Sequence, residues 1–150
     1  MRMVVQRVSR AALTADGRPG DTMAGGLLVF VGIKQGDDEA VMRYMADKLI
    51  HLRVFEDEQG KMNRSVEETG GELFLVSNFT LYGDCRHGRR PSYTESAPVE
   101  EARDIFRRFV DCTAAMTAVP VHQGVFQADM QIDVGLDGPV TLLLDSEKNF

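Results

Sequence analysis

The spacing of apolar residues changes along this chain, and these changes restrict the possible folds more than any other feature. The stretches MRMVVQRV (1–8), AALTADG (11–17) and GGLLVFVGI (25–33) have the apolar patterns and flanking turn residues that are typical of strands. After Asp37 the apolar residues recur at helical spacing, at Val41, Met45, Leu49 and Leu52. The chain therefore begins with strands and continues with a helix.

The middle of the chain repeats this alternation. The segment GELFLVSNFTL (71–81) is predicted to be a central strand, and YGDCRHGRRPSY (82–93) an exposed loop. A second helix is predicted near Pro98, because the next apolar residues again fall on one helical face: Ala102, Ile105, Phe106, Phe109 and Val110.

The C-terminal segment MQIDVGLDGPVTLLLD (130–145) alternates apolar and polar residues up to Leu136. Asp137 and Gly138 are typical turn residues, so this segment is predicted to be a hairpin. Many strands with two helices predict an α+β fold, in which the helices pack on a strongly bent, barrel-like and mainly antiparallel sheet. A chain of 150 residues is expected to form a single domain, 1–150.

The composition excludes several classes of protein. A net charge of −6 argues against a protein that coats nucleic acid, and arginines interrupt the apolar N-terminus, so neither a signal peptide nor a membrane span is expected there. We expect the mature protein to begin at Met1. With no secretory signal, Cys85 and Cys112 are expected to be reduced thiols in a cytoplasmic protein. The three histidines have no metal-ligand spacing, so no metal and no cofactor are expected.

Two segments could carry chemistry. Ser77 and Thr80 follow an apolar strand, where backbone N–H groups that leave the sheet could form an oxyanion hole; alternatively, the two hydroxyls satisfy the strand end. Arg86, Arg89 and Arg90 have a spacing suited to phosphate contacts, or they belong to a solvated loop.

The GPVT stretch (138–141) also has two interpretations. Proline lacks an N–H, so it fits the first residue of a strand. The alternative is that the Gly138–Pro139 bond is cis and that the pair has a functional role. The residues leave this open, because few X–Pro bonds are cis.

Seven short motifs, in order over almost the whole chain, closely resemble the D-aminoacyl-tRNA deacylases, also called the D-tyrosyl-tRNA deacylase family. They are QRV (6–8), GLLVFVGI (26–33), GKMN (60–63), SNFTL (77–81), GRRPSY (88–93), ADMQ (128–131) and GPVT (138–141). The resemblance implies a homodimer of barrel-like subunits that hydrolyses the ester joining a D-amino acid to the 3' ribose of tRNA. It would be a proofreading step of translation, with aminoacyl-tRNA as partner and no membrane involved.

The resemblance also implies roles for residues outside the SNFTL motif. Gly138 and Pro139 would form a cis pair that enters the pocket of the partner subunit, where their carbonyls receive the α-amino group and an L side chain collides. Glycine would escape this rejection, and glycyl-tRNA, including glycine mischarged on tRNA-Ala, would be a substrate. Arg7 would hold the Gly-Pro loop, and Met130 would line the pocket.

For the SNFTL motif, the resemblance implies that residues from Ser77 to Thr80 line the place where the aminoacyl ester binds. The backbone N–H groups near Phe79 and Thr80 would stabilise the oxyanion. Asn78 stands where the family usually has Gln, one methylene longer. Because no Ser/His/Asp set is evident, the ribose 2'-OH of the RNA is the candidate that activates the nucleophile, with Thr80 as a covalent nucleophile the rival.

Two further functions remain open from the residues alone. The chain could be an esterase for small acyl substrates in which Thr80 or Ser77 is the nucleophile. It could also be a non-enzymatic RNA-binding module that uses the arginine loop.

Overall fold

A strongly curved sheet of six strands forms the body of the molecule. The computed structural model describes residues 1–150. The strands are β1 (Arg2–Ala15), β2 (Arg18–Met23), β3 (Gly26–Gly32), β6 (Glu72–Ser77), β7 (Val121–Gln123) and β8 (Met130–Asp145). Their order is β2-β1-β3-β6-β7, with β8 also paired to β1. The pairs β3–β6 and β6–β7 are parallel and the other pairs of this sheet antiparallel.

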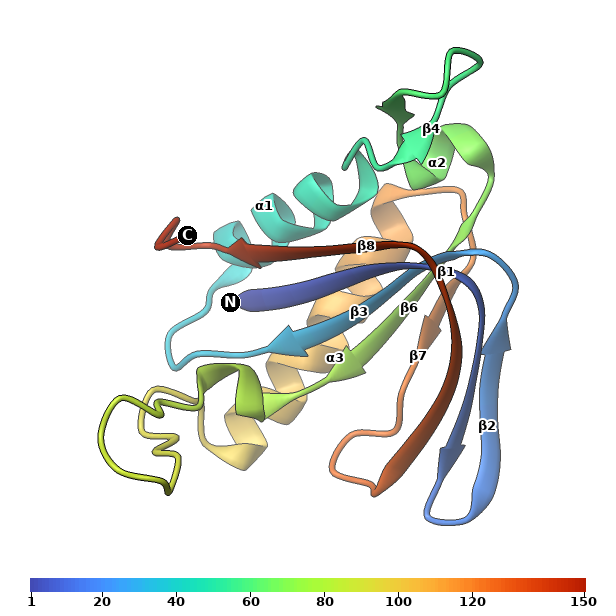
Figure 1. Cartoon of the computed structure of the whole chain (residues 1–150). Helices are drawn as coiled ribbons and strands as arrows, with labels where there is room; N and C mark the ends of the chain where they lie inside the picture. The colour runs from blue at the N-terminus through green and yellow to red at the C-terminus, as the bar shows by residue number, and fades with distance from the viewer.

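The sheet curls until its two ends nearly meet (Figure 1). Near the closure, the backbone N–H of Gln123 on β7 lies 3.3 Å from Oδ2 of Asp21 on β2. The predicted α+β fold with a bent, barrel-like sheet is therefore confirmed.

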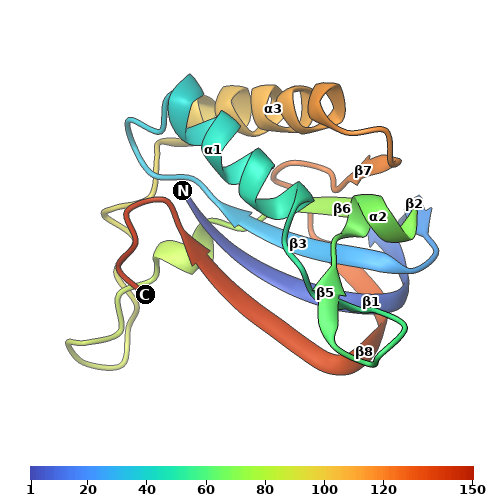
Figure 2. The same cartoon turned by 90° about the horizontal axis from the view of Figure 1, so that it is seen from above.

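Both predicted helices are present, and they lie side by side on one face of the sheet (Figure 2). Helix α1 (Glu39–Ile50) begins after Asp38, whose carboxylate accepts a hydrogen bond from the N–H of Val41 at 2.9 Å. Helix α3 (Val99–Met116) begins after Pro98. Neither these helices nor the short α2 has the length and apolar character needed to cross a lipid bilayer.

Four short elements complete the chain. Strands β4 (Phe55–Glu56) and β5 (Met62–Arg64) form a small hairpin that precedes helix α2 (Val66–Thr69). A capping box at Ser65 and Glu68 starts α2, which the hydrophobic pattern did not predict. The predicted strand 71–81 ends at Ser77, and a 3-10 helix, η1 (Phe79–Tyr82), follows it.

Two apolar cores lie on opposite faces of the sheet. The larger core lies between the sheet and the helices, and includes Met3, Val29, Leu73, Met45, Leu49 and Phe109. The smaller core fills the inside of the bend, and includes Val8, Leu13, Leu28 and Phe74. Val8 and Ala11 both face this second core although three positions separate them, because an irregularity near Arg10 shifts the register of β1.

The predicted hairpin at residues 137–138 is wrong. Strand β8 is one element, and both of its halves pair with β1, through Leu136 opposite Val8 and Thr141 opposite Gln6. Residues 1–8 and 11–17, predicted as separate strands, likewise lie mostly in the single strand β1. Because β1 has 14 residues, it offers a partner to each half of β8, and long-range pairing replaces the local turn. Residues 137–140 bulge out of the ladder opposite Arg7, and the Gly138–Pro139 peptide bond is cis.

Candidate active site

An apolar pocket of about 530 Å³ opens where the end of β6, the start of α3 and the loop after β7 meet. Most of its lining is hydrophobic, which is usual for a site that binds a small organic group. The residues that line it include Ser77, Asn78, Phe79, Tyr93, Phe126, Gln127 and Met130. The structure therefore brings together four of the predicted site residues: Ser77, Asn78, Phe79 and Met130.

The polypeptide leaves the sheet at Asn78. The N–H of Asn78 makes the last ladder bond of this region, to the carbonyl of Val31 at 2.8 Å, and η1 begins at the next residue. The side chain of Asn78 then caps η1, because its Oδ1 accepts from the backbone N–H of Thr80 at 3.2 Å. The hydroxyl of Thr80 donates to the same oxygen.

The N–H of Phe79 occupies the first position of η1, where a helix has no internal acceptor for it. No backbone or side-chain hydrogen bond within the chain uses this donor. Phe79 lines the pocket, and its ring packs edge-on against Tyr93 with 5.0 Å between centroids. The pocket wall thus includes Phe79 with an unused backbone N–H, whereas Thr80 lies outside the lining and its N–H is engaged.

No carboxylate, histidine, lysine or arginine lines this pocket. His122 pairs with Glu72 at 2.6 Å and His51 contacts Asp47, both away from the lining. No three metal-ligating side chains come together anywhere in the chain. The pocket can therefore offer shape and backbone donors, but its lining has no side chain suited to act as a general base at neutral pH.

Arg7, Gly138 and Pro139 lie outside this pocket. Arg7 is buried, and its Nη1 donates to the carbonyl of Val54 at 2.7 Å. Its Nε lies 3.0 Å from Oδ2 of Asp137, although this contact lacks hydrogen-bond geometry and Nε has no hydrogen-bond partner. A Cβ atom built on Gly138 would lie 3.3 Å from Nη2 of Arg7. Arg7 thus packs under the bulge, while Gly138 and Pro139 face solvent.

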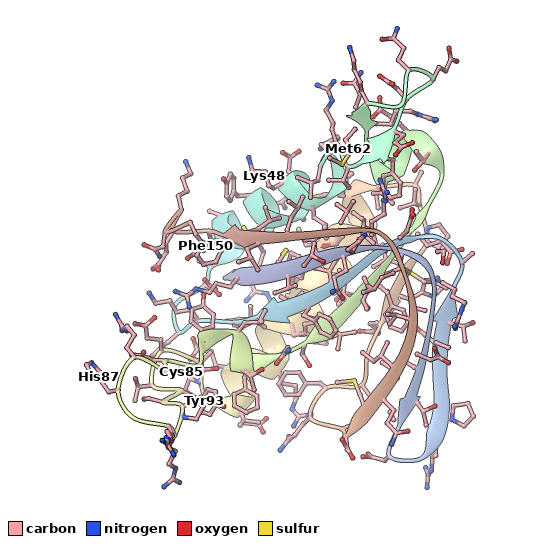
Figure 3. The ribbon with its side chains drawn as sticks, viewed as in Figure 1. Lys48, Met62, Cys85, His87, Tyr93 and Phe150 are labelled. Atoms are coloured by element: carbon pink, nitrogen blue, oxygen red, sulfur yellow. The ribbon has the colours of Figure 1, made fainter.

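The arginines of the predicted exposed loop differ in their contacts. Arg86 makes a two-bond contact with Asp84, at 2.7 and 2.8 Å, and its guanidinium holds the pKa of the Asp84 carboxyl below its ordinary value. Arg89 and Arg90 are exposed and form no such ion pair. Figure 3 shows that Cys85, His87 and Tyr93 all come from this projecting segment, at the opposite end of the molecule from Met62.

The sequence did not predict the remaining walls of the pocket. Ser96 to Val99 come from the segment that leads into α3, and Phe126 to Ala128 from the loop between β7 and β8. Apart from Ala128, which begins the ADMQ motif, these residues belong to none of the seven motifs, and tertiary packing brings them beside Asn78.

A family model described as D-Tyr-tRNA(Tyr) deacylase matches residues 4–145, almost the entire chain. The chain belongs to this family. The D-aminoacyl-tRNA deacylase of Desulfitobacterium hafniense (strain DSM 10664 / DCB-2) is 53% identical over 152 residues, with all of both chains covered.

Two solved structures have the same fold as this chain. One, titled c-Myc DNA Unwinding Element Binding Protein, is 35% identical, with a TM-score of 0.91 over 97% of this chain and 98% of its own. Another, titled a probable eukaryotic D-amino acid tRNA deacylase, is 15% identical, with a TM-score of 0.81 over 95% of this chain and 97% of its own, and it shows the fold alone.

Proposed function

We propose that this member of the deacylase family hydrolyses the ester between a D-amino acid and the 3' ribose of tRNA, releasing the free amino acid and the tRNA. Such a reaction is a chiral proofreading step of translation, and it would take place in the cytoplasm because that is where translation uses aminoacyl-tRNA. The observation that carries the proposal is the apolar pocket with the unused N–H of Phe79 at its wall. The two cores on one shared sheet support one domain over residues 1–150.

The pocket supports a mechanism in which the protein supplies donors and shape. Water attacks the ester carbonyl, the N–H of Phe79 stabilises the oxyanion, and the bond to the ribose 3' oxygen breaks as that oxygen takes the proton that the water gives up. The N–H of Thr80 would add a second donor once the side chain of Asn78 releases it. Since no base lines the pocket, the neighbouring 2'-OH of the RNA is the group that assists the attacking water.

Chiral selection would come from Gly138 and Pro139 of a second copy. These residues are exposed and lie outside the pocket of their own chain, so they are available to a partner. Arg7 and Asp137 hold the base of the bulge. Carbonyls held there would receive the α-amino group and leave no room for an L side chain, whereas glycine, including glycyl-tRNA-Ala, would pass.

The exposed face and edge of β8 support a homodimer. Leu136 and Leu143 on this strand are 51% and 57% exposed, and β8 pairs with β1 alone, so one edge of the strand is unpaired. Unpaired edges with exposed apolar side chains favour association with another chain. A second copy seated there would bring its own Gly138 and Pro139 to the interface.

Arg89 and Arg90 are the residues proposed to contact tRNA phosphates, with Arg86 joining them if the RNA displaces Asp84. All three lie on the loop that also supplies Tyr93 to the pocket mouth. This arrangement would let the loop hold the RNA while its aminoacyl end enters the pocket.

The test is to incubate the purified chain with D-tyrosyl-tRNA, L-tyrosyl-tRNA and p-nitrophenyl acetate. We expect release of D-tyrosine, with the L ester and the aryl ester untouched. Turnover of the aryl ester without the D ester would instead identify an esterase for small acyl groups. RNA binding without turnover of any ester would identify a binding module.

A further inference from the structure

Arg103 contacts two residues of the pocket wall from outside the pocket. Its Nη2 donates to Oε1 of Gln127 at 2.7 Å, and its guanidinium carbon lies 4.9 Å from the centroid of the Phe126 ring. Phe126 and Gln127 line the pocket, whereas Arg103 lies behind them on α3. One arginine thus links the start of α3 to the loop that closes the site.

This loop needs support from outside. Gln127 has a φ of 67°, in the left-handed region that residues other than glycine rarely adopt. The local backbone contributes one hydrogen bond, from Ala128 N to Val125 O at 3.3 Å, and the Phe126 ring packs 6.2 Å from Phe106. An unfavourable backbone angle persists when the surrounding contacts hold it, and the contacts of Arg103 are among these.

We propose that Arg103 is a positioning residue for substrate: it holds Phe126 and Gln127 in the arrangement that receives the aminoacyl-adenosine end of D-aminoacyl-tRNA. This inference rests on the proposed function. It extends that function by assigning a residue to the binding of the RNA terminus.

Arginine suits this role because its planar group can donate to an amide while its face covers an aromatic ring. Glu100 lies on the solvent side, with Oε2 3.6 Å from Nε of Arg103. Lysine would keep the charge but could not make both contacts in the same geometry. The role is therefore specific to the shape of the side chain as well as to its charge.

The first test compares Arg103→Ala with Arg107→Ala. Arg107 lies one turn further along α3 and pairs with Asp104 at 2.9 Å, away from the pocket, so it is a matched control. Arg103→Ala should raise KM for D-tyrosyl-tRNA about three- to tenfold, because the competent form of the loop becomes less populated, and leave kcat nearly unchanged. Arg103→Lys should recover little of this loss, and Arg107→Ala should behave as the parent.

The second test measures binding without hydrolysis. The probe is D-tyrosine joined through an amide to 3'-amino-3'-deoxyadenosine, and its Kd is measured by calorimetry. Arg103→Ala and Gln127→Ala should each raise the Kd of the probe. In the double variant, Kd should rise by less than the product of the two single-variant factors.

Two outcomes separate this inference from the proposed function. If the parent hydrolyses D-tyrosyl-tRNA and Arg103→Ala matches Arg107→Ala in both KM and Kd, the positioning role is wrong and the proposed function stands. If the parent neither hydrolyses the ester nor binds the probe, both are wrong. Unchanged thermal unfolding of Arg103→Ala would show that the effect is local to the loop.

Discussion

Oδ1 of Asn78 accepts hydrogen bonds from both donors of Thr80, its backbone N–H at 3.2 Å and its hydroxyl. An amide oxygen is not a base that could take the proton of the hydroxyl. The hydroxyl of Thr80 is therefore occupied but not activated, and the side chain points to a structural role at the start of η1.

Thr80→Ala should accordingly retain deacylation, because the variant keeps the backbone N–H of residue 80. We expect the single-turnover rate with D-tyrosyl-tRNA to stay within about tenfold of the parent, whereas loss of a true nucleophile costs on the order of 10⁴-fold or more. Thr80→Ser serves as the conservative control. Complete loss of turnover in a folded Thr80→Ala protein, or isolation of an acyl-Thr80 adduct from the parent, would contradict the mechanism.

Arg89→Ala combined with Arg90→Ala should weaken tRNA binding and make it less sensitive to salt. Each lost phosphate contact should lower the slope of log K against log salt by about 0.7 to 0.9. The paired control is Arg43→Ala with Arg107→Ala, two arginines on α1 and α3 that are engaged in helical ion pairs. Identical slopes for the two double variants would show that the loop is a solvated surface.

Much of this fold follows from local patterns in the sequence. The helical spacing predicts α1 and α3, and the strand residues predict a bent sheet, because these signals are local and agree with the tertiary packing. The β8 hairpin was predicted wrongly because Asp137-Gly138 is a local turn signal, whereas pairing of both halves with β1 is long-range. Helix α2 had a readable signal, the capping box at Ser65 and Glu68.

The residues of the candidate site also differ in how far the sequence predicts them. Ser77, Asn78 and Phe79 are adjacent in sequence, so one motif predicts them together. Phe126 and Gln127 precede the ADMQ motif and belong to none of the seven motifs, and their place in the pocket depends on how β7, β8 and α3 close around it. The engagement of Thr80 by Asn78 also depends on side-chain geometry that the residue types do not specify.

Gly138→Ala should impair hydrolysis while leaving the chain folded. An added Cβ would lie 2.9 Å from Cγ2 of Val140 and 3.0 Å from its N, and the φ of 114° is one that alanine rarely adopts, so the bulge must shift. We expect a marked loss of D-tyrosyl-tRNA hydrolysis. Hydrolysis of the L ester is measured in parallel. Gly17→Ala is the control, because Gly17 also has a positive φ but no atom within 4 Å of the added Cβ. Equal rates in the two variants would show that Gly138 has no role in the site.

Light scattering should return a mass of about twice the 16.7 kDa chain at micromolar concentration. Leu143→Glu should shift this mass toward one chain, because it places a charge on the exposed apolar face of β8. The same change should lower deacylation if each pocket needs its partner. A parent protein with the mass of a single chain and full activity would contradict the shared site.

In the proposed mechanism the protein supplies backbone donors and shape, while the RNA supplies the assisting hydroxyl. The most direct measurement is the single-turnover hydrolysis of D-tyrosyl-tRNA whose terminal nucleotide is 2'-deoxyadenosine, with the ester on the 3' oxygen. We predict a rate at least about 10²-fold below that of the ribose substrate, because the 2'-OH can no longer relay a proton from the attacking water, with competitive binding unchanged. Equal rates for the two substrates would contradict the claim and would require a base or nucleophile from the protein.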